Sequence, residues 1–548
     1  MRNRSFLLLL STLFTLPGLA WGTNTAAPSG ACAALKQMAL PNAKITVAEN
    51  VAAGAFSPPN LKKGEKVSHL FEAAPAFCRV VITLTPTADS DIQVEVWMPV
   101  SGWNGKFRGQ GNGGFAGYIA YTGLAASISQ GYAAASTDTG HSTEGAAWAL
   151  EHPEKVVDYG YRAVHEMTTQ AKAIVRAFYG DDPKRSYFAG CSNGGRQALM
   201  EAQRFPDDYD GIIAGAPANA WVPMLTGGLK LMQMNDGTGY IPAAKVPAIG
   251  KAVLAACDAQ DGIVDGVLND PKQCHFDPST ILCKGPDSDT CLTAPQVNTL
   301  KMIYSGAHDS SGQQIFPGFL PGGEDGHGGW ATWITGSEQG KSSGVFFVTG
   351  YFSNMVFGKS DWDYRSANID DAFKLAYEKT ADSLNATNPD LKPFLARGGK
   401  LILYHGWNDP GISPLNTISY YKQSVAAIGS QNAGRSLRLY MVPGMQHCGG
   451  GPGATSFEQD EAASRSDPQH DIFTALVQWV ENGAAPSSII ATKYFDSPTK
   501  TVEMTRPLCP YPEVAQYKGT GEKNLAESFV CKSENSGAAE NNGTAETH

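Results

Sequence analysis

Hydrophobic residues along the chain form short runs that alternate with longer amphipathic stretches. The short runs are rich in β-branched and aromatic residues and end in Gly, Pro or Asp, which predicts strands at 80–86, 92–99, 185–190, 210–217, 400–406 and 437–444. Helical periodicity marks 158–180 and 471–483, and the second stretch begins at an Asp and ends at a Gly, as a capped helix does. Strands that alternate with helices indicate βαβ units and a mostly parallel sheet, and therefore an α/β fold.

The pattern changes in the middle of the chain. From about residue 219 to residue 397 strand signals nearly disappear, while glycines, scattered aromatic residues and two pairs of close cysteines appear. We interpret this block as an insertion that caps the sheet. The predicted organisation is an α/β domain in two parts, 23–218 and 398–531, with a lid domain at 219–397 between them.

Both ends of the chain are predicted to lie outside this organisation. Residues 1–22 contain two arginines, then an apolar run and small residues, the pattern of a cleaved signal peptide whose run is too short to be a stable membrane span. Residues 532–548 lack any large apolar residue, which predicts a disordered tail. We therefore expect a soluble, secreted or periplasmic protein with no membrane partner.

Composition and charge narrow the possible partners. Of the 548 residues 42% are hydrophobic and 17% charged, which is typical of a folded, loop-rich protein. The formal net charge is -10 and no basic run occurs, which argues against a nucleic-acid partner. Ten cysteines, an even number, agree with export to an oxidising compartment.

A serine within a glycine frame is the strongest candidate for chemistry. Residues 190–194, GCSNG, have the G-x-S-x-G pattern and lie between a predicted strand and a helical stretch. A strand-to-helix turn of this kind forces the serine into a strained backbone conformation, and the flanking glycines leave room for neighbouring elements. We therefore predict that Ser192 is exposed at the C-terminal edge of the sheet.

A serine hydroxyl becomes an effective nucleophile only when a base removes its proton, and a carboxylate usually orients that base. In α/β-hydrolases the order along the chain is Ser, acid, His. Asp409 and His447 each follow one of the last two predicted strands, so Ser192, Asp409 and His447 meet this order. His405 is expected to hold a loop by hydrogen bonding, and His141 is a further candidate to line the pocket.

Cysteines adjoin two of these three residues. Cys191 precedes Ser192 and Cys448 follows His447, so the two sulfurs come within bonding range if Ser192 and His447 meet. A disulfide there would join the two catalytic loops. The alternative is that Cys191 is itself the nucleophile, which requires a reduced thiol of low pKa and fits poorly with export.

Three other cysteine pairs are suggested by closeness in sequence. The four cysteines outside these pairs allow three pairings. If a disulfide joins Cys191 to Cys448, Cys32 and Cys78 are left to bond to each other. The predicted pairs are Cys257–Cys274, Cys283–Cys291, Cys509–Cys531, Cys191–Cys448 and Cys32–Cys78.

An oxyanion hole needs two backbone N–H groups, one from the residue after the nucleophile and one from a glycine-rich loop after an early strand. The first is Asn193. The stretch 103–117 supplies a suitable loop, although its glycines are equally compatible with a plain surface turn. We choose Gly114 as the second donor, with Gly113 as the nearest alternative.

A cluster of acidic residues lies in a short loop that a predicted disulfide closes. Asp258, Asp261 and Asp265 fall within eight residues, and hard oxygen ligands at this density suit Ca²⁺, with the backbone carbonyls of Ile263 and Val267 completing the set. The loop is not an EF-hand, because it has no Glu at the twelfth position. A solvated acidic turn is the alternative, but close carboxylates repel one another without a cation. We predict a structural Ca²⁺ site.

These motifs together resemble the tannase and feruloyl esterase family of secreted α/β-hydrolases, which includes the mono(2-hydroxyethyl) terephthalate hydrolases. The resemblance extends from about residue 32 to residue 531 and is carried by GCSNGG around Ser192, HGWND with Asp409, GMQHC with His447 and the loop that begins CDAQDGIVDG. It implies an α/β-hydrolase fold with a large inserted lid that contains calcium, the oxyanion roles of Gly114 and Asn193, and the five disulfides.

The resemblance also implies a serine esterase that hydrolyses small aromatic esters through an acyl-enzyme. Hydroxycinnamoyl or galloyl esters are the family's usual substrates, and mono(2-hydroxyethyl) terephthalate is the alternative. Trp330, Trp333 and Phe347 are candidates to stack on the substrate ring, although packing within the lid is the more common role. Two other classes compete: a thiol–disulfide oxidoreductase that uses Cys191 and Cys448, and an inactive binding module for plant phenolics or glycans.

Overall fold

The computed structural model describes residues 30–59, 68–143, 145–459, 467–495 and 501–533. The predicted signal peptide and most of the predicted tail lie outside these residues. Lys532 and Ser533 belong to strand β15 (Phe529–Ser533), so the predicted tail begins two residues too early. These two residues remain in the strand because it pairs with β14 (Glu513–Tyr517) and carries Cys531, which is disulfide-bonded.

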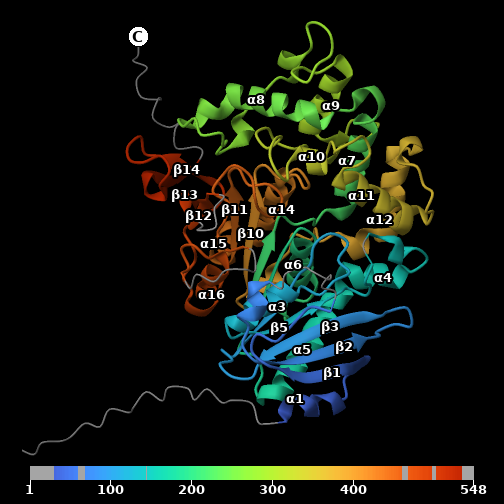
Figure 1. Cartoon of the computed structure of the whole chain (residues 1–548), viewed down its shortest axis with the longest axis vertical. Coiled ribbons are helices and arrows are strands. Elements are labelled where there is room, and N and C mark those ends of the chain that lie inside the picture. Colours follow the sequence, from blue (N-terminus) through green and yellow to red (C-terminus); the bar gives the residue numbers. More distant parts are fainter. Residues whose placement is uncertain (1–29, 60–67, 144, 460–466, 496–500, 534–548) are drawn as a thin grey trace, which may run out of the picture.

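A nine-stranded sheet forms the centre of the fold (Figure 1). Its strand order is β1-β2-β3-β5-β4-β6-β7-β10-β11, and the six strands from β5 onward in this order run parallel. The mixed α/β architecture confirms the predicted fold class. The strands are β1 (Ala43–Val51), β2 (Phe77–Leu84), β3 (Ile92–Pro99), β4 (Lys106–Gln110), β5 (Ala133–Thr137), β6 (Arg185–Cys191), β7 (Gly211–Gly215), β10 (Lys400–Gly406) and β11 (Leu437–Val442).

Strand β4 was not predicted. It lies inside the stretch that the sequence indicated as a glycine-rich loop, because KFRGQ has no β-branched residue and contains Gly109. Its position between β5 and β6 buries it, and a Cβ on Gly109 would lie 2.3 Å from the Tyr209 hydroxyl. Tertiary pairing, rather than local propensity, makes this segment a strand.

Helices cover both faces of the sheet. Phe188 of β6 packs into a cluster with residues of α5, α6 and α14, whereas its neighbour Tyr187 packs with α16 on the opposite face. The predicted helix at 471–483 is α16, whose N-terminus Asp471 caps by accepting hydrogen bonds from two backbone N–H groups. The helices of the sheet domain are α1 (Ala31–Ala34), α2 (His69–Glu72), α3 (Tyr121–Ser129), α4 (Pro153–Val157), α5 (Ala163–Tyr179), α6 (Asn193–Arg204), α14 (Pro414–Ile428), α15 (Ser430–Ser436) and α16 (Ile472–Asn482).

The segment between β7 and β10, which the sequence predicts to be the lid, is mostly helical. Figure 1 shows α7 to α10 beyond the ends of β10 and β11. The limits of the lid domain stay a prediction. Its elements are α7 (Trp221–Met234), α8 (Val246–Cys257), α9 (Ala294–Ser305), α10 (Trp330–Trp333), α11 (Ser343–Gly350), α12 (Ile369–Leu384), α13 (Lys392–Ala396), β8 (Ala307–His308) and β9 (Gln314–Phe316). A further hairpin, β12 (Ile489–Tyr494) and β13 (Val502–Leu508), follows α16.

One stretch of the described chain, Gly237–Asp261, is long and apolar enough to cross a membrane by length and composition alone. It contains α8, which has 12 residues, and short 3₁₀ turns, and 39% of its apolar window is buried inside the protein. A single stretch of this kind is weak evidence for a membrane span.

All five predicted disulfides are present in the structure. The bonds are Cys32–Cys78, Cys191–Cys448, Cys257–Cys274, Cys283–Cys291 and Cys509–Cys531. Because Cys191 is bonded to Cys448, it is not the free thiol that the cysteine-nucleophile hypothesis required. Five disulfides also agree with an oxidising compartment outside the cytoplasm.

Candidate active site

Ser192 occupies the turn between β6 and α6, as predicted. Its φ of 64° and ψ of -120° place a non-glycine residue in a strained region of backbone space. A Cβ on Gly190 would lie 2.7 Å from the backbone of Gly194, so the close approach of strand and helix requires the glycine. The Ser192 N–H donates to the Gly215 carbonyl at 3.0 Å, which fixes the turn to the neighbouring strand.

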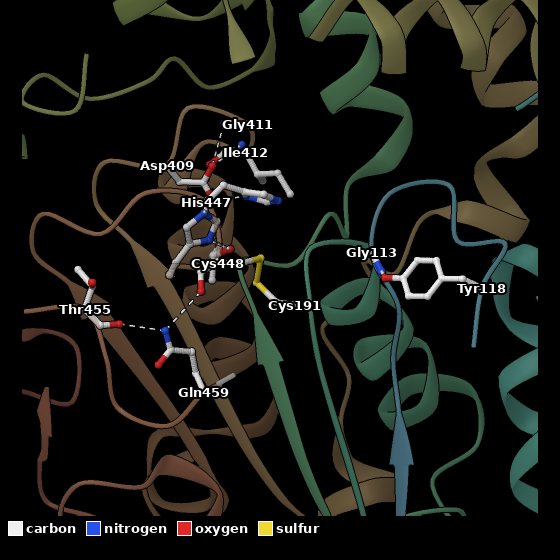
Figure 2. Close-up of a disulfide and its surroundings, with 12 residues drawn as sticks. Gly113, Tyr118, Cys191, Asp409, Gly411, Ile412, His447, Cys448, Thr455 and Gln459 are labelled. Atoms are coloured by element: carbon white, nitrogen blue, oxygen red, sulfur yellow. Dashed lines mark hydrogen bonds and ion pairs between the residues drawn. A yellow bond between two sulfur atoms is a disulfide. The ribbon is translucent and has the colours of Figure 1, made fainter. Parts of the chain in front are cut away.

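Asp409 and His447 meet beyond the ends of β10 and β11. His447 Nδ1 donates to Asp409 Oδ2 at 2.8 Å, and His405 Nε2 lies 3.1 Å from the same oxygen. The other oxygen, Oδ1, accepts the N–H groups of Gly411 at 2.8 Å and Ile412 at 2.9 Å. Figure 2 shows Asp409 beside His447, Gly411 and Ile412. The structure therefore brings the predicted acid and the predicted base together.

The groups around Asp409 keep its carboxyl group ionised. Burial by itself would raise the pKa of this carboxyl, but the charge of His447 and the hydrogen bonds from His405 and His447 outweigh burial and hold the pKa well below its ordinary value. Asp409 therefore remains a carboxylate at neutral and mildly acidic pH.

His405 holds the Asp409 loop, in agreement with the prediction. It is fully buried, and its Nε2 contacts the Ile412 carbonyl at 3.1 Å. Because a carbonyl only accepts, Nε2 carries the proton, and Nδ1 accepts from the Thr417 hydroxyl at 2.8 Å. The ring thus joins β10, the Asp409 loop and α14.

The Cys191–Cys448 disulfide links the residue before Ser192 to the residue after His447 (Figure 2). The two Cα atoms are 6.0 Å apart. Ser192 and His447 line one common cavity, although among the described residues no hydrogen bond joins the Ser192 hydroxyl to the imidazole. In enzymes without substrate this contact is often long and tightens only when substrate binds.

The glycine-rich loop distinguishes Gly114 from Gly113. The Gly113 N–H donates to the Tyr118 hydroxyl at 2.8 Å, so this donor is already used (Figure 2). Gly114 has a φ of 60° and lines the cavity together with Ser192 and Asn193. Its carbonyl accepts from the Tyr159 hydroxyl at 2.9 Å, which anchors the peptide unit that follows Gly114. This geometry favours Gly114 over Gly113 as the second oxyanion donor.

Side chains of α6 hold this loop against the nucleophile turn. Gln197 accepts the N–H of Asn112 at 3.0 Å and donates to the Asn112 side chain at 2.8 Å, while the Asn193 amide donates to the Asn112 carbonyl at 3.0 Å. Arg196, which is fully buried, donates to the Asn193 side chain through two nitrogens. Sequence reasoning predicted Asn193 but missed Asn112, Arg196 and Gln197; GGRQ, which follows Asn193, is the only local signal for the last two.

His141 does not line the pocket as the sequence suggested. It is buried, its Nε2 contacts the Phe115 carbonyl at 2.7 Å, and its ring stacks on Trp148 with centroids 4.0 Å apart. Burial lowers its pKa to about 4, so it is neutral at pH 7. His141 therefore supports the glycine-rich loop through its contact with the Phe115 carbonyl.

Two of the three candidate lid aromatics reach the site. Trp333 lies edge-on to the His447 ring at 4.7 Å and parallel to Phe347 at 5.9 Å. Both rings line the cavity with Ser192. Trp330 is instead buried in the lid core, where it packs against Tyr304 at 5.8 Å. The short α10 therefore places one tryptophan on the catalytic centre and the other in the lid core.

The three carboxylates of the acidic loop each accept backbone N–H groups of the same loop. Asp258 accepts the N–H of Gly266, and Asp261 accepts those of Ile263 and Asn269. A carboxylate oxygen that accepts one N–H keeps a second lone pair for a metal ion. Burial, with the charges of Asp265 and Asp258, raises the pKa of Asp261 to about 6, which a cation would relieve. A Ca²⁺ ion at these residues stays a prediction.

The fold and the geometry of the site together define a class of enzyme. A mostly parallel sheet with a strained serine between strand and helix, and with Asp and His beyond two later strands, defines an α/β-hydrolase. The chain belongs to the family described as tannase and feruloyl esterase, whose profile matches residues 78–532. It is a carboxylic ester hydrolase, as the resemblance predicted.

Relatives and solved structures agree with this family. An uncharacterized esterase of Xanthomonas campestris pv. campestris is 42% identical over 97% of this chain and 96% of its own length. A probable feruloyl esterase B-1 of Aspergillus fumigatus is 32% identical over 83% and 85%. The crystal structure of feruloyl esterase B from Aspergillus oryzae is similar with a TM-score of 0.83 and 28% identity over 92% of this chain and 99% of that one.

Gln197→Leu removes both hydrogen bonds from α6 to Asn112 and keeps a side chain of similar size. We expect kcat for a chromogenic ester to fall about 10- to 100-fold with little change in KM, because a displaced oxyanion donor weakens transition-state stabilisation alone. Gln203→Leu is the matched control, since Gln203 lies on the same helix and bonds the Ala386 carbonyl and Tyr420 instead. A normal kcat in Gln197→Leu would contradict the prediction.

Removing the Cys191–Cys448 disulfide by a double Cys→Ala substitution should lower both stability and kcat. The bond closes a loop with a sequence separation of 257, and even a 100-residue loop contributes about 4.7 kcal/mol in the chain-entropy model. The double Cys→Ala variant at Cys283 and Cys291, whose separation is 8, is the control and should keep normal kcat. Denaturant unfolding and steady-state kinetics give the two readouts, and equal effects in both variants would refute the positioning role.

Proposed function

We propose that Ser192, His447 and Asp409 form a catalytic triad that hydrolyses carboxylic esters of aromatic acids through an acyl-enzyme. The observation that carries this proposal is the hydrogen bond from His447 to a buried, ionised Asp409, directly beside the disulfide that links the His447 loop to the Ser192 turn. Two distant segments are thereby held at one edge of the sheet.

The tautomer of His447 follows from its partner. Asp409 is a carboxylate and only accepts, so Nδ1 of His447 carries a proton and Nε2 is free to take the proton of the Ser192 hydroxyl. The serine oxygen then attacks the ester carbonyl, and the imidazolium that forms is stabilised by Asp409. His447 passes the proton to the leaving alcohol, which leaves the acyl group on Ser192.

The developing negative charge on the carbonyl oxygen is accepted by backbone donors. Asn193 is the first residue of α6, where N–H groups have no partner within the helix and the helix dipole favours an anion. Gly114 offers the second N–H from the loop that Asn112 anchors. Water, activated by His447 in the same way, then attacks the acyl-enzyme and releases the acid.

The substrate is proposed to be a hydroxycinnamoyl or galloyl ester. A feruloyl esterase B from Aspergillus oryzae and a tannin acyl hydrolase from Aspergillus niger have the same fold as this chain. Mono(2-hydroxyethyl) terephthalate is the alternative. Aromatic lining by Trp333 and Phe347 supports an aromatic acid in either case. The five disulfides support a secreted or periplasmic location.

We also propose a structural Ca²⁺ ion in the lid. The carboxylates of Asp258, Asp261 and Asp265 and the carbonyls of Ile263 and Val267 would hold it, and Arg506 donates to Asp265 at 2.9 Å from the hairpin after α16. When bound, the ion neutralises charge in a loop of the lid and takes no part in ester hydrolysis. Its support is the clustering of hard oxygen donors in a disulfide-closed loop.

Ser192→Ala tests the triad. We expect kcat/KM for a chromogenic aromatic ester to fall at least about 10⁴-fold, with unchanged melting temperature, because the nucleophile alone is lost. A fluorophosphonate should label the wild-type protein on the peptide that contains Ser192, as read by mass spectrometry. Retained activity in the variant, or labelling of another residue, would disprove the triad.

Calcium removal tests the lid site. Chelation with EGTA should lower the melting temperature, since an ion present at 100 times its Kd contributes about 2.7 kcal/mol to stability. Activity at 25 °C should change little. Asp261→Asn should abolish the effect of EGTA, whereas Asp287→Asn, an exposed aspartate of another lid loop, should retain it. An identical melting temperature with and without EGTA would contradict calcium binding.

A further inference from the structure

The cavity that Ser192 and His447 line reaches from the catalytic centre into the lid, and we call it the lid cavity. It is lined by residues of α7, α9, α10, α11 and the turn after β9, and part of it is open to solvent.

Its walls are mostly apolar. Along α7, Met224, Gly228 and Leu231 recur at intervals of three or four residues, so one face of this helix borders the cavity. Ile303 of α9 and Ile334 after α10 lie on the other sides. Among the described residues that line the cavity there is no Asp, Glu, Lys or Arg side chain.

Apart from the indole N–H groups of Trp221 and Trp333, the polar side chains among the described residues that line the lid cavity are those of Ser192, Asn193 and His447, at its catalytic end. An acyl group bound to Ser192 places its ester carbonyl beside these groups, and the far end of its ring lies against the apolar walls. The part of the substrate most distant from the ester thus enters the least polar surroundings.

A second cavity meets the lid cavity at Ser192 and has a different character. Ser192, His447 and Gly114 line both cavities, and the second is also lined by polar side chains such as Asn112 and Gln459. A polar, open cavity suits the leaving alcohol and the attacking water. The apolar lid cavity is consequently the better place for the acyl ring.

We propose that the lid cavity selects uncharged aromatic acyl groups and rejects those with a carboxylate at the far end of the ring, so that terephthalate monoesters are poor substrates. This inference rests on the proposed function of Ser192 as nucleophile. A carboxylate loses its hydration when it enters an apolar cavity, and among the described residues that line this cavity there is no Lys or Arg side chain to balance its charge. A neutral substituent of the same shape has no such penalty.

The test compares two esters that differ in charge and hardly in shape, monomethyl terephthalate and methyl 4-acetylbenzoate. We expect kcat/KM at pH 7 to be at least about 100-fold higher for the neutral acetyl ester. Equal kcat/KM values for the two esters, both lost in Ser192→Ala, would overturn the selectivity and leave the triad intact. Turnover of either ester that survives Ser192→Ala would instead overturn the proposed function.

A charge placed in the wall should change the preference. Leu231→Lys introduces a cation, and Leu231→Gln is its neutral control with a similar loss of apolar surface. We expect the ratio of kcat/KM for monomethyl terephthalate over methyl 4-acetylbenzoate to be at least about 10-fold higher in Leu231→Lys than in Leu231→Gln. Melting temperatures confirm that both variants fold. Equal ratios in two folded variants would show that the acyl ring does not bind along α7 and would overturn the proposal.

Discussion

The buried carboxylate of Asp409 is the constraint on which the rest of the site depends. A carboxylate removed from water is costly unless its oxygens are satisfied, and here four donors satisfy them: two backbone N–H groups of its own loop and two histidines. The two backbone donors fix the conformation of the loop, and His405 attaches that loop to β10. The hydrogen bond to Asp409 in turn fixes the orientation of the His447 ring. One ionised group thereby determines the loop conformation, the orientation of the base and its tautomer.

The catalytic groups come from segments far apart in the chain, and the protein joins them by several kinds of contact. The disulfide between Cys191 and Cys448 joins the nucleophile turn to the base. Gln197 and Asn193 join the turn to the glycine-rich loop by hydrogen bonds. Trp333 joins the lid to the same site, because its ring packs against the His447 ring. Each member of the proposed triad is therefore held by more than one contact.

The parts of this site that the sequence predicts are those whose residues carry a local signal. Ser192 has its strand-turn-helix context, and Asp409 and His447 follow apolar strands. Strand β4 and the roles of Gly113 and His141 could not be predicted, because they depend on partners elsewhere: β4 on its two neighbouring strands, Gly113 on the Tyr118 hydroxyl and His141 on the Phe115 carbonyl. The walls of the lid cavity are assembled from several helices whose packing no periodicity reveals.

The division of labour between sheet and lid follows from this difference. The sheet domain supplies the charged and hydrogen-bonded groups, whose positions must be fixed closely for catalysis, and strand ends and a helix N-terminus provide such positions. The lid supplies mainly shape and polarity, which many combinations of side chains can satisfy. Leu231 or Met224 can change without disturbing Asp409, because neither contributes to the hydrogen bonds around that carboxylate. The proposed selectivity for the acyl group can therefore vary while the proposed chemistry at Ser192 stays the same.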